Sequence, residues 1–138
     1  MAPRTLLAMV DIAHRDNALA LCHEAASHLR PDDTLHVAYV MPYAHFSYVE
    51  PYVSADSIKA AAARAHEELT TLCKDAGLTA KEHVLRGSVG EQALLLAKDL
   101  NPDMVLLNAH RPGIQMHTLG SHAAQIVRHA PCTVLVKK

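Results

Sequence analysis

The sequence predicts a doubly wound α/β domain, in which a parallel β-sheet carries helices on both faces. The chain has 138 residues, the length of one compact domain, so residues 1–138 are expected to fold as a single unit. Short apolar runs alternate with longer amphipathic ones in the order βαβαβαβαβ. Strands joined through helices run parallel, and right-handed crossovers between them lead to this architecture.

The first two strands and the helix between them are marked by apolar runs and a breaker. Leu6–Val10 is apolar at every position, as suits a central strand that is covered on both faces. Asp16 is expected to cap a helix whose apolar residues recur at helical spacing up to Leu29, and Pro31 ends it. Leu35–Val40 is the expected second strand.

The second half of the chain continues the alternation. After an irregular stretch, a helix is expected from about Ser57 to Ala76, and Gly77 stands where a C-cap favours glycine. Ser88 and Glu91 have the spacing of a capping box that opens a further helix. The remaining elements are expected at Ala80–Leu85 (strand), up to about Leu100 (the capping-box helix), Met104–Leu107 (strand), Leu119–His129 (helix) and Thr133–Val136 (strand).

Composition argues against several classes of protein. Thirteen basic and 14 acidic side chains give a net charge of -1, which leaves no electrostatic footprint for nucleic acid. No run approaches the roughly 18 apolar residues of a membrane span, so membrane insertion is not expected. The three cysteines lack CxxC spacing and are expected to be buried, reduced thiols of a cytoplasmic protein: Cys22, Cys73 and Cys132.

The segment Asn108–His122 is the richest place for chemistry, because such sheets bind ligands beyond the carboxyl ends of their strands, where the strand order reverses. Gly120 and Ser121 open an expected helix, whose free amides and dipole favour an anion. Alternatively, Ser121 is an ordinary N-cap and Gly120 a loop residue. Asp11 follows the first strand and either accepts hydrogen bonds from a base or ribose or is a solvated Asx-turn residue.

These features resemble the universal stress protein family, in particular its compact bacterial branch. The resemblance spans essentially the whole chain and is most specific in the tail. It is carried by Met9-Val10-Asp11, Tyr39-Val40-Met41-Pro42, His110-Arg111-Pro112, Leu119-Gly120-Ser121, Val127-Arg128-His129-Ala130 and Val134-Leu135-Val136.

The resemblance implies an open five-stranded parallel sheet of order 3-2-1-4-5 with helices on both faces, an adenine nucleotide alpha hydrolase-like fold. It implies a homodimer that pairs through the last strand, Cys132–Val136, and an exposed sheet edge there needs a partner. It further implies a stress-response regulator that binds ATP or AMP, with or without Mg²⁺, and acts on an unidentified downstream protein. Asp11 and the Val40 backbone would hold the adenosine, and Gly120, Ser121 and the His122 amide the phosphates.

The sequence departs from the family's G-x2-G-x9-G-[ST] motif. Asn108 and Arg111 stand where its first two glycines would be, and the spacing from Asn108 to Gly120 is one residue short. Arg111, beside His110, could supply charge to a phosphate or be a solvated loop residue. The alternative function is therefore a dimeric interaction module that has lost its nucleotide. Without a Walker lysine, ATP hydrolysis should be very slow at most.

The 11 histidines and five aromatic residues are unevenly distributed. His110, His117 and His122 crowd around the candidate site, but no HExxH or Cys/His cluster supports a metal centre. His66 and His83 are read as isolated on their elements, and most histidines as surface groups. The aromatic residues fall in one window, Tyr39–Tyr52, as a lid, a partner-facing patch or a loop that folds its rings onto the domain.

Overall fold

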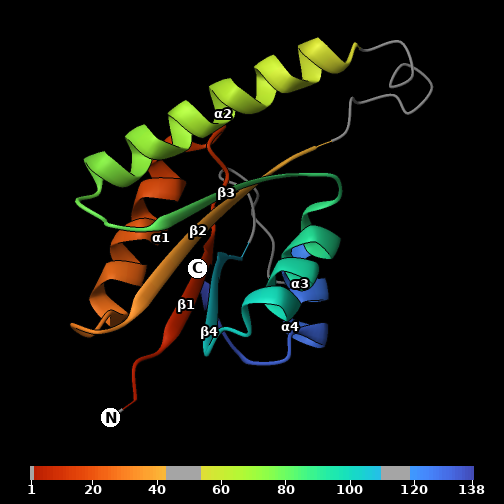
Figure 1. The fold of residues 1–138 in the computed structure, drawn as a ribbon. Helices are drawn as coiled ribbons and strands as arrows, with labels where there is room; N and C mark the ends of the chain where they lie inside the picture. Colours follow the sequence, from red (N-terminus) through yellow and green to blue (C-terminus); the bar gives the residue numbers. More distant parts are fainter. Residues whose placement is uncertain (1, 43–53, 110–118) are drawn as a thin grey trace.

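The computed structural model describes residues 2–42, 54–109 and 119–138, and these form alternating strands and helices (Figure 1). Each element lies within two residues of the range expected from the sequence. The elements are β1 (Thr5–Met9), α1 (Arg15–His28), β2 (Thr34–Met41), α2 (Ala55–Asp75), β3 (Lys81–Arg86), α3 (Val89–Leu100), β4 (Met104–Asn108), α4 (Ser121–His129) and β5 (Thr133–Lys137).

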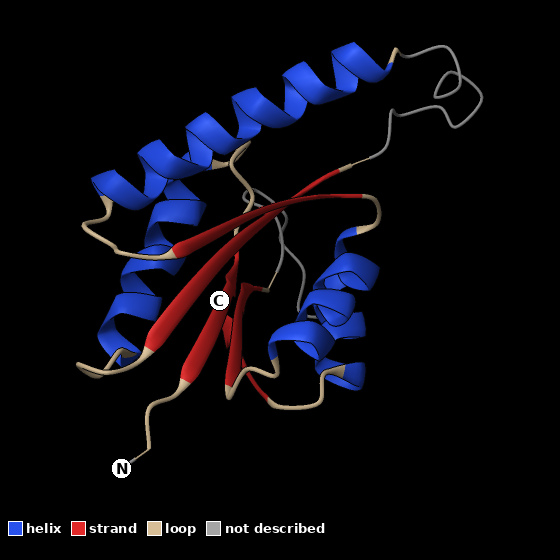
Figure 2. Ribbon diagram, in the orientation of Figure 1, coloured by secondary structure: helices blue, strands red, loops and turns tan. Residues whose placement is uncertain are grey.

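The five strands form one parallel sheet in the order β3-β2-β1-β4-β5, which confirms the fold class and the order implied by the resemblance. In the central register, Ala8 of β1 lies between Val37 of β2 and Leu106 of β4. The helices cover both faces, with α1 and α2 on one side and α3 and α4 on the other (Figure 2).

Two apolar layers hold the helices to the sheet, and β1 contributes to both. Its alternating side chains place Leu6 and Ala8 in the layer under α1 and α2, and Leu7 and Met9 in the layer under α3 and α4. All four are nearly or fully buried, so the uniformly apolar sequence of this strand reflects burial on both faces.

The three cysteines are free, and two of them lie in the layer under α1 and α2. Burial raises the pKa of the Cys22 thiol to about 11, and burial also raises that of Cys73 to about 12, so both stay protonated. Cys132 is only half-buried, which corrects the expectation of three buried thiols.

One expected N-cap is wrong, and another lacks the side-chain bond expected of it. The helix α1 begins at Arg15 with His14 as N-cap, two residues before the expected cap, because the Asp11 carbonyl accepts the His14 N–H (3.1 Å) and forms a turn that leads into the helix. Asp16 therefore lies in the first turn, where its charge suits the helix dipole. Ser88 is the N-cap of α3, but its side chain makes no capping bond. Ser54 does cap a helix, since its Oγ accepts the Ser57 N–H (3.0 Å).

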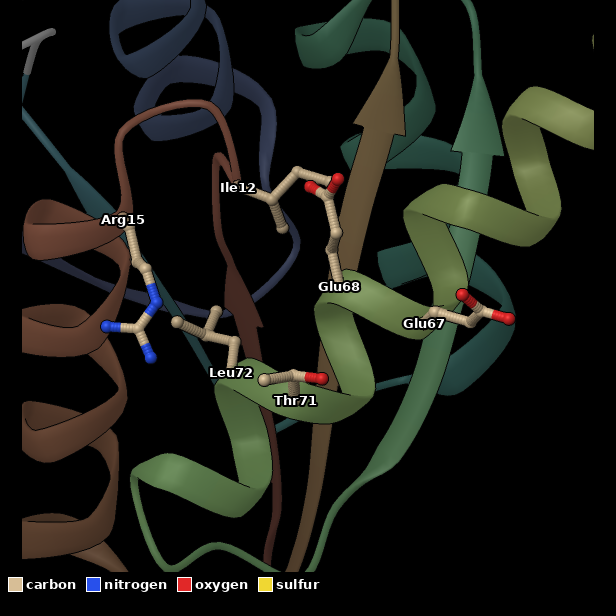
Figure 3. Close-up of a pocket in the computed structure, with 6 residues that line it drawn as sticks. All are labelled: Ile12, Arg15, Glu67, Glu68, Thr71 and Leu72. Atoms are coloured by element: carbon tan, nitrogen blue, oxygen red, sulfur yellow. The ribbon is translucent and has the colours of Figure 1, made fainter.

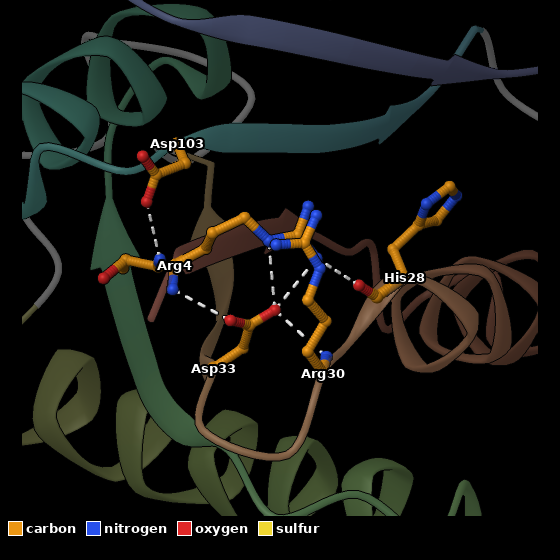
Figure 4. Close-up of polar contacts among 6 residues, drawn as sticks. Arg4, His28, Arg30, Asp33 and Asp103 are labelled. Carbon is orange, nitrogen blue, oxygen red and sulfur yellow. Dashed lines mark hydrogen bonds and ion pairs between the residues drawn. The ribbon is translucent and has the colours of Figure 1, made fainter. Parts of the chain in front are cut away.

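An ionic network ties the start of β1 to the turn between α1 and β2 (Figure 4). The Asp33 carboxylate accepts hydrogen bonds from the backbone N–H groups of Arg4 (2.8 Å) and Arg30 (3.0 Å). The Arg4 guanidinium donates to the same carboxylate (2.9 Å) and to the His28 carbonyl. These bonds, first that of the Arg4 backbone, lower the pKa of Asp33 to about 2 from 3.8.

We expect the Asp33 carboxylate to contribute stability above pH 3.8 and to lose that contribution as the pH falls toward about 2, because its folded pKa is depressed. Replacement Asp33→Asn should lower the urea concentration at the midpoint of unfolding at pH 7. It should also weaken the decrease in stability between pH 3.8 and about pH 2. The matched control is Asp32→Asn, which changes an exposed neighbour. If the stability of Asp33→Asn decreases as steeply with falling pH as that of the wild type, the assignment to Asp33 is wrong.

Candidate functional site

The fold brings three of the expected site residues to one edge of the sheet. Asp11, Val40 and Asn108 lie at or just beyond the carboxyl ends of β1, β2 and β4, three neighbouring strands. The connections run outward in opposite directions from β1 and β4, so the strand order reverses between them. Such a switch point is where open α/β sheets bind ligands.

Asp11 forms an Asx-type turn and still presents a carboxylate to solvent. Its Oδ1 accepts the Ala13 N–H (3.0 Å), and its Oδ2 lies 3.9 Å from Nε2 of His14. The side chain is 46% exposed. The turn and the binding role are therefore compatible, because one oxygen serves the loop while the other remains accessible.

The backbone of Val40 points toward the space beyond the end of β1. Ala38 accepts the Val10 N–H (2.9 Å) on the β1 side, and backbone groups two residues apart in a strand point the same way. The N–H and C=O of Val40 therefore face β1, whose pairing with β2 ends at Met9 and Ala38. Val40 itself is only 4% exposed, so its side chain belongs to the core.

Asn108 is engaged by the protein. Its Nδ2 donates to the Asn17 carbonyl in the first turns of α1 (3.3 Å), and the residue is half-buried. Where the family motif has a glycine, this chain thus has a side chain that fastens β4 to α1. His110 and Arg111, the next two residues expected at the site, and His117 lie outside the described residues, as do all the aromatic residues except Tyr39.

The helix α4 opens on Gly120, which is its N-cap, so the alternative of Ser121 as N-cap is wrong. The Gly120 N–H donates to the Ala109 carbonyl (2.9 Å) and is not available to a ligand. The next amides, those of Ser121, His122 and Ala123, lack intrahelical acceptors because of their position in the first turn. Ser121 and His122 are exposed, and the first turn carries no acidic residue.

A pocket beside this edge was not found by sequence reasoning. It has a volume of about 330 Å³ and lies between the turn after β1 and helix α2 (Figure 3), lined by Ile12, Arg15, Glu67, Glu68, Thr71 and Leu72. Burial raises the pKa of the nearby Tyr39, and the charges of Asp11 and Glu68 raise it further. Nothing in the sequence pattern indicated this pocket, because it forms only where α2 packs beside the turn after β1.

Two histidines that are isolated on their own elements have partners on neighbouring ones. Nε2 of His66 on α2 lies 3.4 Å from the carboxylate of Glu82 on β3. His83, the next residue of β3, contacts His36 of β2. Neither contact is local in sequence, so helical or strand spacing could not show it. In the described ranges, no group of three or more His, Cys, Asp or Glu side chains could hold a metal ion.

Comparisons with known proteins identify the family of this chain. A sequence model described as "Universal stress protein family" matches residues 3–138. The chain belongs to the universal stress protein family. Among the helices that the structure describes, none is both long and apolar enough to cross a membrane.

Two curated relatives are both named universal stress protein G. The protein from Salmonella typhimurium is 27% identical over 139 residues, which cover 96% of this chain and 97% of the relative. The protein from Shigella flexneri is 43% identical over 56 residues, which cover 41% of this chain and only 39% of that relative. The higher identity is thus confined to a part of the family domain.

Solved universal stress proteins share the fold over the whole domain. The protein UspA from Lactobacillus plantarum matches with a TM-score of 0.76 at 22% identity, covering 100% of both chains. A protein from Archaeoglobus fulgidus in complex with dAMP matches with a TM-score of 0.67 at 16% identity, covering 99% of this chain and 98% of that one. A family protein from Arabidopsis thaliana with AMP bound matches with a TM-score of 0.63 at 17% identity, covering 97% of this chain and 90% of that one.

Proposed function

We propose that this chain is a regulatory stress-response protein of the cytoplasm that binds ATP or AMP and acts as a dimer. The observation that carries the proposal is the convergence at one switch point of an accessible carboxylate, an outward-facing strand backbone and a helix N-terminus without acidic residues. Structural neighbours from Archaeoglobus fulgidus and Arabidopsis thaliana that contain dAMP and AMP support the choice of ligand.

Each part of this edge suits one part of an adenine nucleotide. The N–H and C=O of Val40 offer a donor and an acceptor to the edge of a base, and Oδ2 of Asp11, which lies 3.9 Å from Nε2 of His14, can accept from ribose hydroxyls. The amides of Ser121 and His122, with the Ser121 hydroxyl, suit phosphate oxygens at the positive end of α4. His110 and Arg111 remain expected phosphate contacts from the sequence. Mg²⁺ would enter with ATP, bound by its phosphates.

A second candidate function is an interaction module of the same fold that binds no nucleotide. The bond from Asn108 to the Asn17 carbonyl favours it, because a half-buried side chain stands in place of a motif glycine. In this case, the downstream protein would recognise the dimer alone, whatever the nucleotide concentration.

We expect recombinant protein to release an adenine nucleotide on denaturation, and Asp11→Asn to bind ATP about tenfold or more weakly than the wild type. Hydrogen bonds to a charged group contribute about 1.5–3 kcal/mol, and asparagine keeps the oxygen that accepts the Ala13 N–H. The measurement is isothermal titration of nucleotide-free protein. The matched control is Asp16→Asn, an exposed carboxylate in α1.

The outcomes separate the two candidate functions. If neither the wild type nor the variants bind ATP or AMP, the interaction module stands and the nucleotide proposal is wrong. If Asp11→Asn binds as tightly as the wild type, the carboxylate does not contact the ligand. Any ATP hydrolysis should stay below about 1 per second, the low end for kinases.

The proposed dimer interface is the free edge of β5. The Lys137 carbonyl accepts the Ala109 N–H (2.9 Å) on the β4 side. Because the backbone groups of successive strand residues point to opposite sides, those of Val134 and Val136 point to the outer edge. These outward groups form a strand edge that a second copy can pair with.

We expect Val134→Pro to convert a wild-type dimer into a monomer that remains folded, because proline removes an outward N–H and leaves the β4 ladder intact. Light scattering measures the mass, and circular dichroism the fold. Leu135→Pro is the control, since its N–H points toward β4 and its loss should unfold the edge of the sheet. A Val134→Pro protein that stays dimeric would place the interface elsewhere.

A further inference from the structure

Two histidine rings meet across neighbouring strands, on the face of the sheet that α3 and α4 cover. His36 of β2 is 7% exposed, and its Nδ1 lies 2.8 Å from Nε2 of His83 on β3. The rings are stacked, with centroids 5.1 Å apart and an angle of 28° between planes. In the register, His36 lies opposite Lys81 and His83 opposite Ala38, so the rings meet diagonally.

The surroundings of this pair are apolar or positively charged. Ala38 and Leu85 share its face with the core layer under α3 and α4, and Leu7 lies opposite His36 on β1. The buried residues of α3 toward the sheet are Gly90, Ala93, Leu96 and Ala97. The ionisable side chains of the two covering helices are exposed: Glu91, Lys98 and Asp99 on α3, and His122, Arg128 and His129 on α4.

The charged groups of β3 itself flank the pair. Lys81 is the charge that acts on both rings, and Glu82 belongs to the opposite face, where it contacts His66 and Thr70 of α2. Burial lowers the pKa of His36 first, followed by the charges of His83 and Lys81. Burial and then Lys81 lower the pKa of His83. At neutral pH both rings are therefore uncharged, and one donates to the other.

We propose that the His36–His83 pair is a proton-sensitive latch, which holds the edge strand β3 to β2 at neutral pH and loosens it in acid. The first proton places a charge in an apolar layer beside Lys81. The second proton converts the accepting nitrogen into a donor, so that two N–H groups face each other and the bond is lost. The latch rests on the fold alone and not on the proposed nucleotide site.

The direction of the pH dependence follows from linkage. An unfolded histidine titrates near pH 6.5, and in the folded chain both groups titrate lower. The open state therefore binds more protons, so the stability of the pairing is complete above about pH 6.5 and falls as the pH decreases through the folded pKa values. The effect should be local, because β3 has β2 as its only neighbour in the described sheet.

Native-state hydrogen exchange at about pH 7.5 and about pH 5 tests the latch. After correction for intrinsic exchange rates, we expect the amides of β3 to lose about tenfold or more of their protection at the lower pH, while those of β4 keep theirs. The loss of protection on acidification measures how far the folded pKa values lie below the unfolded ones. The double variant His36→Leu/His83→Leu should lose this dependence, and the control His66→Gln should retain it.

Two results would overturn the latch. One is β3 protection in the wild type that is the same at both pH values. The other is a double variant whose β3 strand is as acid-sensitive as that of the wild type. Should the double variant fail to fold, nitrogen NMR of the wild-type imidazoles decides the matter. Both rings must stay neutral to a lower pH than the exposed imidazole of His129 and gain protons together with the opening of β3, and rings that titrate without any opening of β3 would overturn the latch.

Discussion

Replacing Gly120 with valine is expected to weaken ATP binding by about tenfold to a hundredfold while the fold persists. The N-cap backbone has φ −60° and ψ 160°, values that any residue adopts, so valine brings no backbone strain there. Its branched side chain would instead stand in front of the Ser121 and His122 amides. Losing a hydrogen bond to a charged phosphate costs about 1.5–3 kcal/mol, which corresponds to this range of affinity.

The measurement is isothermal titration with ATP and with AMP, accompanied by thermal unfolding. Ser88→Val is the matched control, because Ser88 is also an N-cap without a side-chain capping bond, on α3. Both variants should lose a similar amount of stability, on the order of 1 kcal/mol or less, but only Gly120→Val should lose affinity. Equal ATP affinity in Gly120→Val and wild type would show that phosphates do not bind at α4.

Truncating Leu106 to alanine is expected to destabilise the domain by about 2–5 kcal/mol, the largest effect on stability among the changes considered. Leu106 is 0% exposed at the centre of β4, between Ala8 of β1 and Leu135 of β5. The substitution would leave a cavity in the apolar layer under α1 and α2. Because Leu106 is surrounded by buried side chains, little rearrangement could fill this cavity. A loss of this size is a large fraction of the 5–15 kcal/mol typical of a domain.

Urea unfolding at neutral pH measures this loss. The control is Leu95→Ala on α3, whose side chain is 50% exposed and should change the free energy of unfolding by about 0.5 kcal/mol or less. A Leu106→Ala protein within 1 kcal/mol of the wild type would mean that β4 is not the rigid centre of the sheet.

The elements could be predicted because their signals are local. Uniform apolarity at Leu6–Val10 and helical periodicity elsewhere depend only on neighbouring residues. The order of the strands came from the family resemblance, since local patterns do not determine which strands are neighbours. The cap position was missed at Asp16, and the capping bond expected at Ser88 is absent, because both depend on how the chain enters the helix.

The sequence predicted the place in the fold of several candidate site residues but not their geometry. The sequence placed Asp11 and Val40 at the correct edge, yet not the direction of the Val40 backbone, which follows from where β1 stops pairing. The contact of Asn108 with Asn17 and that of His36 with His83 join residues far apart in the chain. Such contacts follow from tertiary packing, and no sequence spacing records them.

The hydrogen bond from the Gly120 N–H to the Ala109 carbonyl bears on how the family motif can vary. It joins residues 109 and 120 directly, so the end of β4 and the start of α4 are held together by a bond that involves none of the residues between them. The closure entropy of a loop grows only logarithmically, by about 0.6 kcal/mol per doubling of its length. A motif one residue shorter therefore costs the domain almost nothing, and evolution or design could graft other lengths and compositions there, changing ligand preference while the scaffold stays the same.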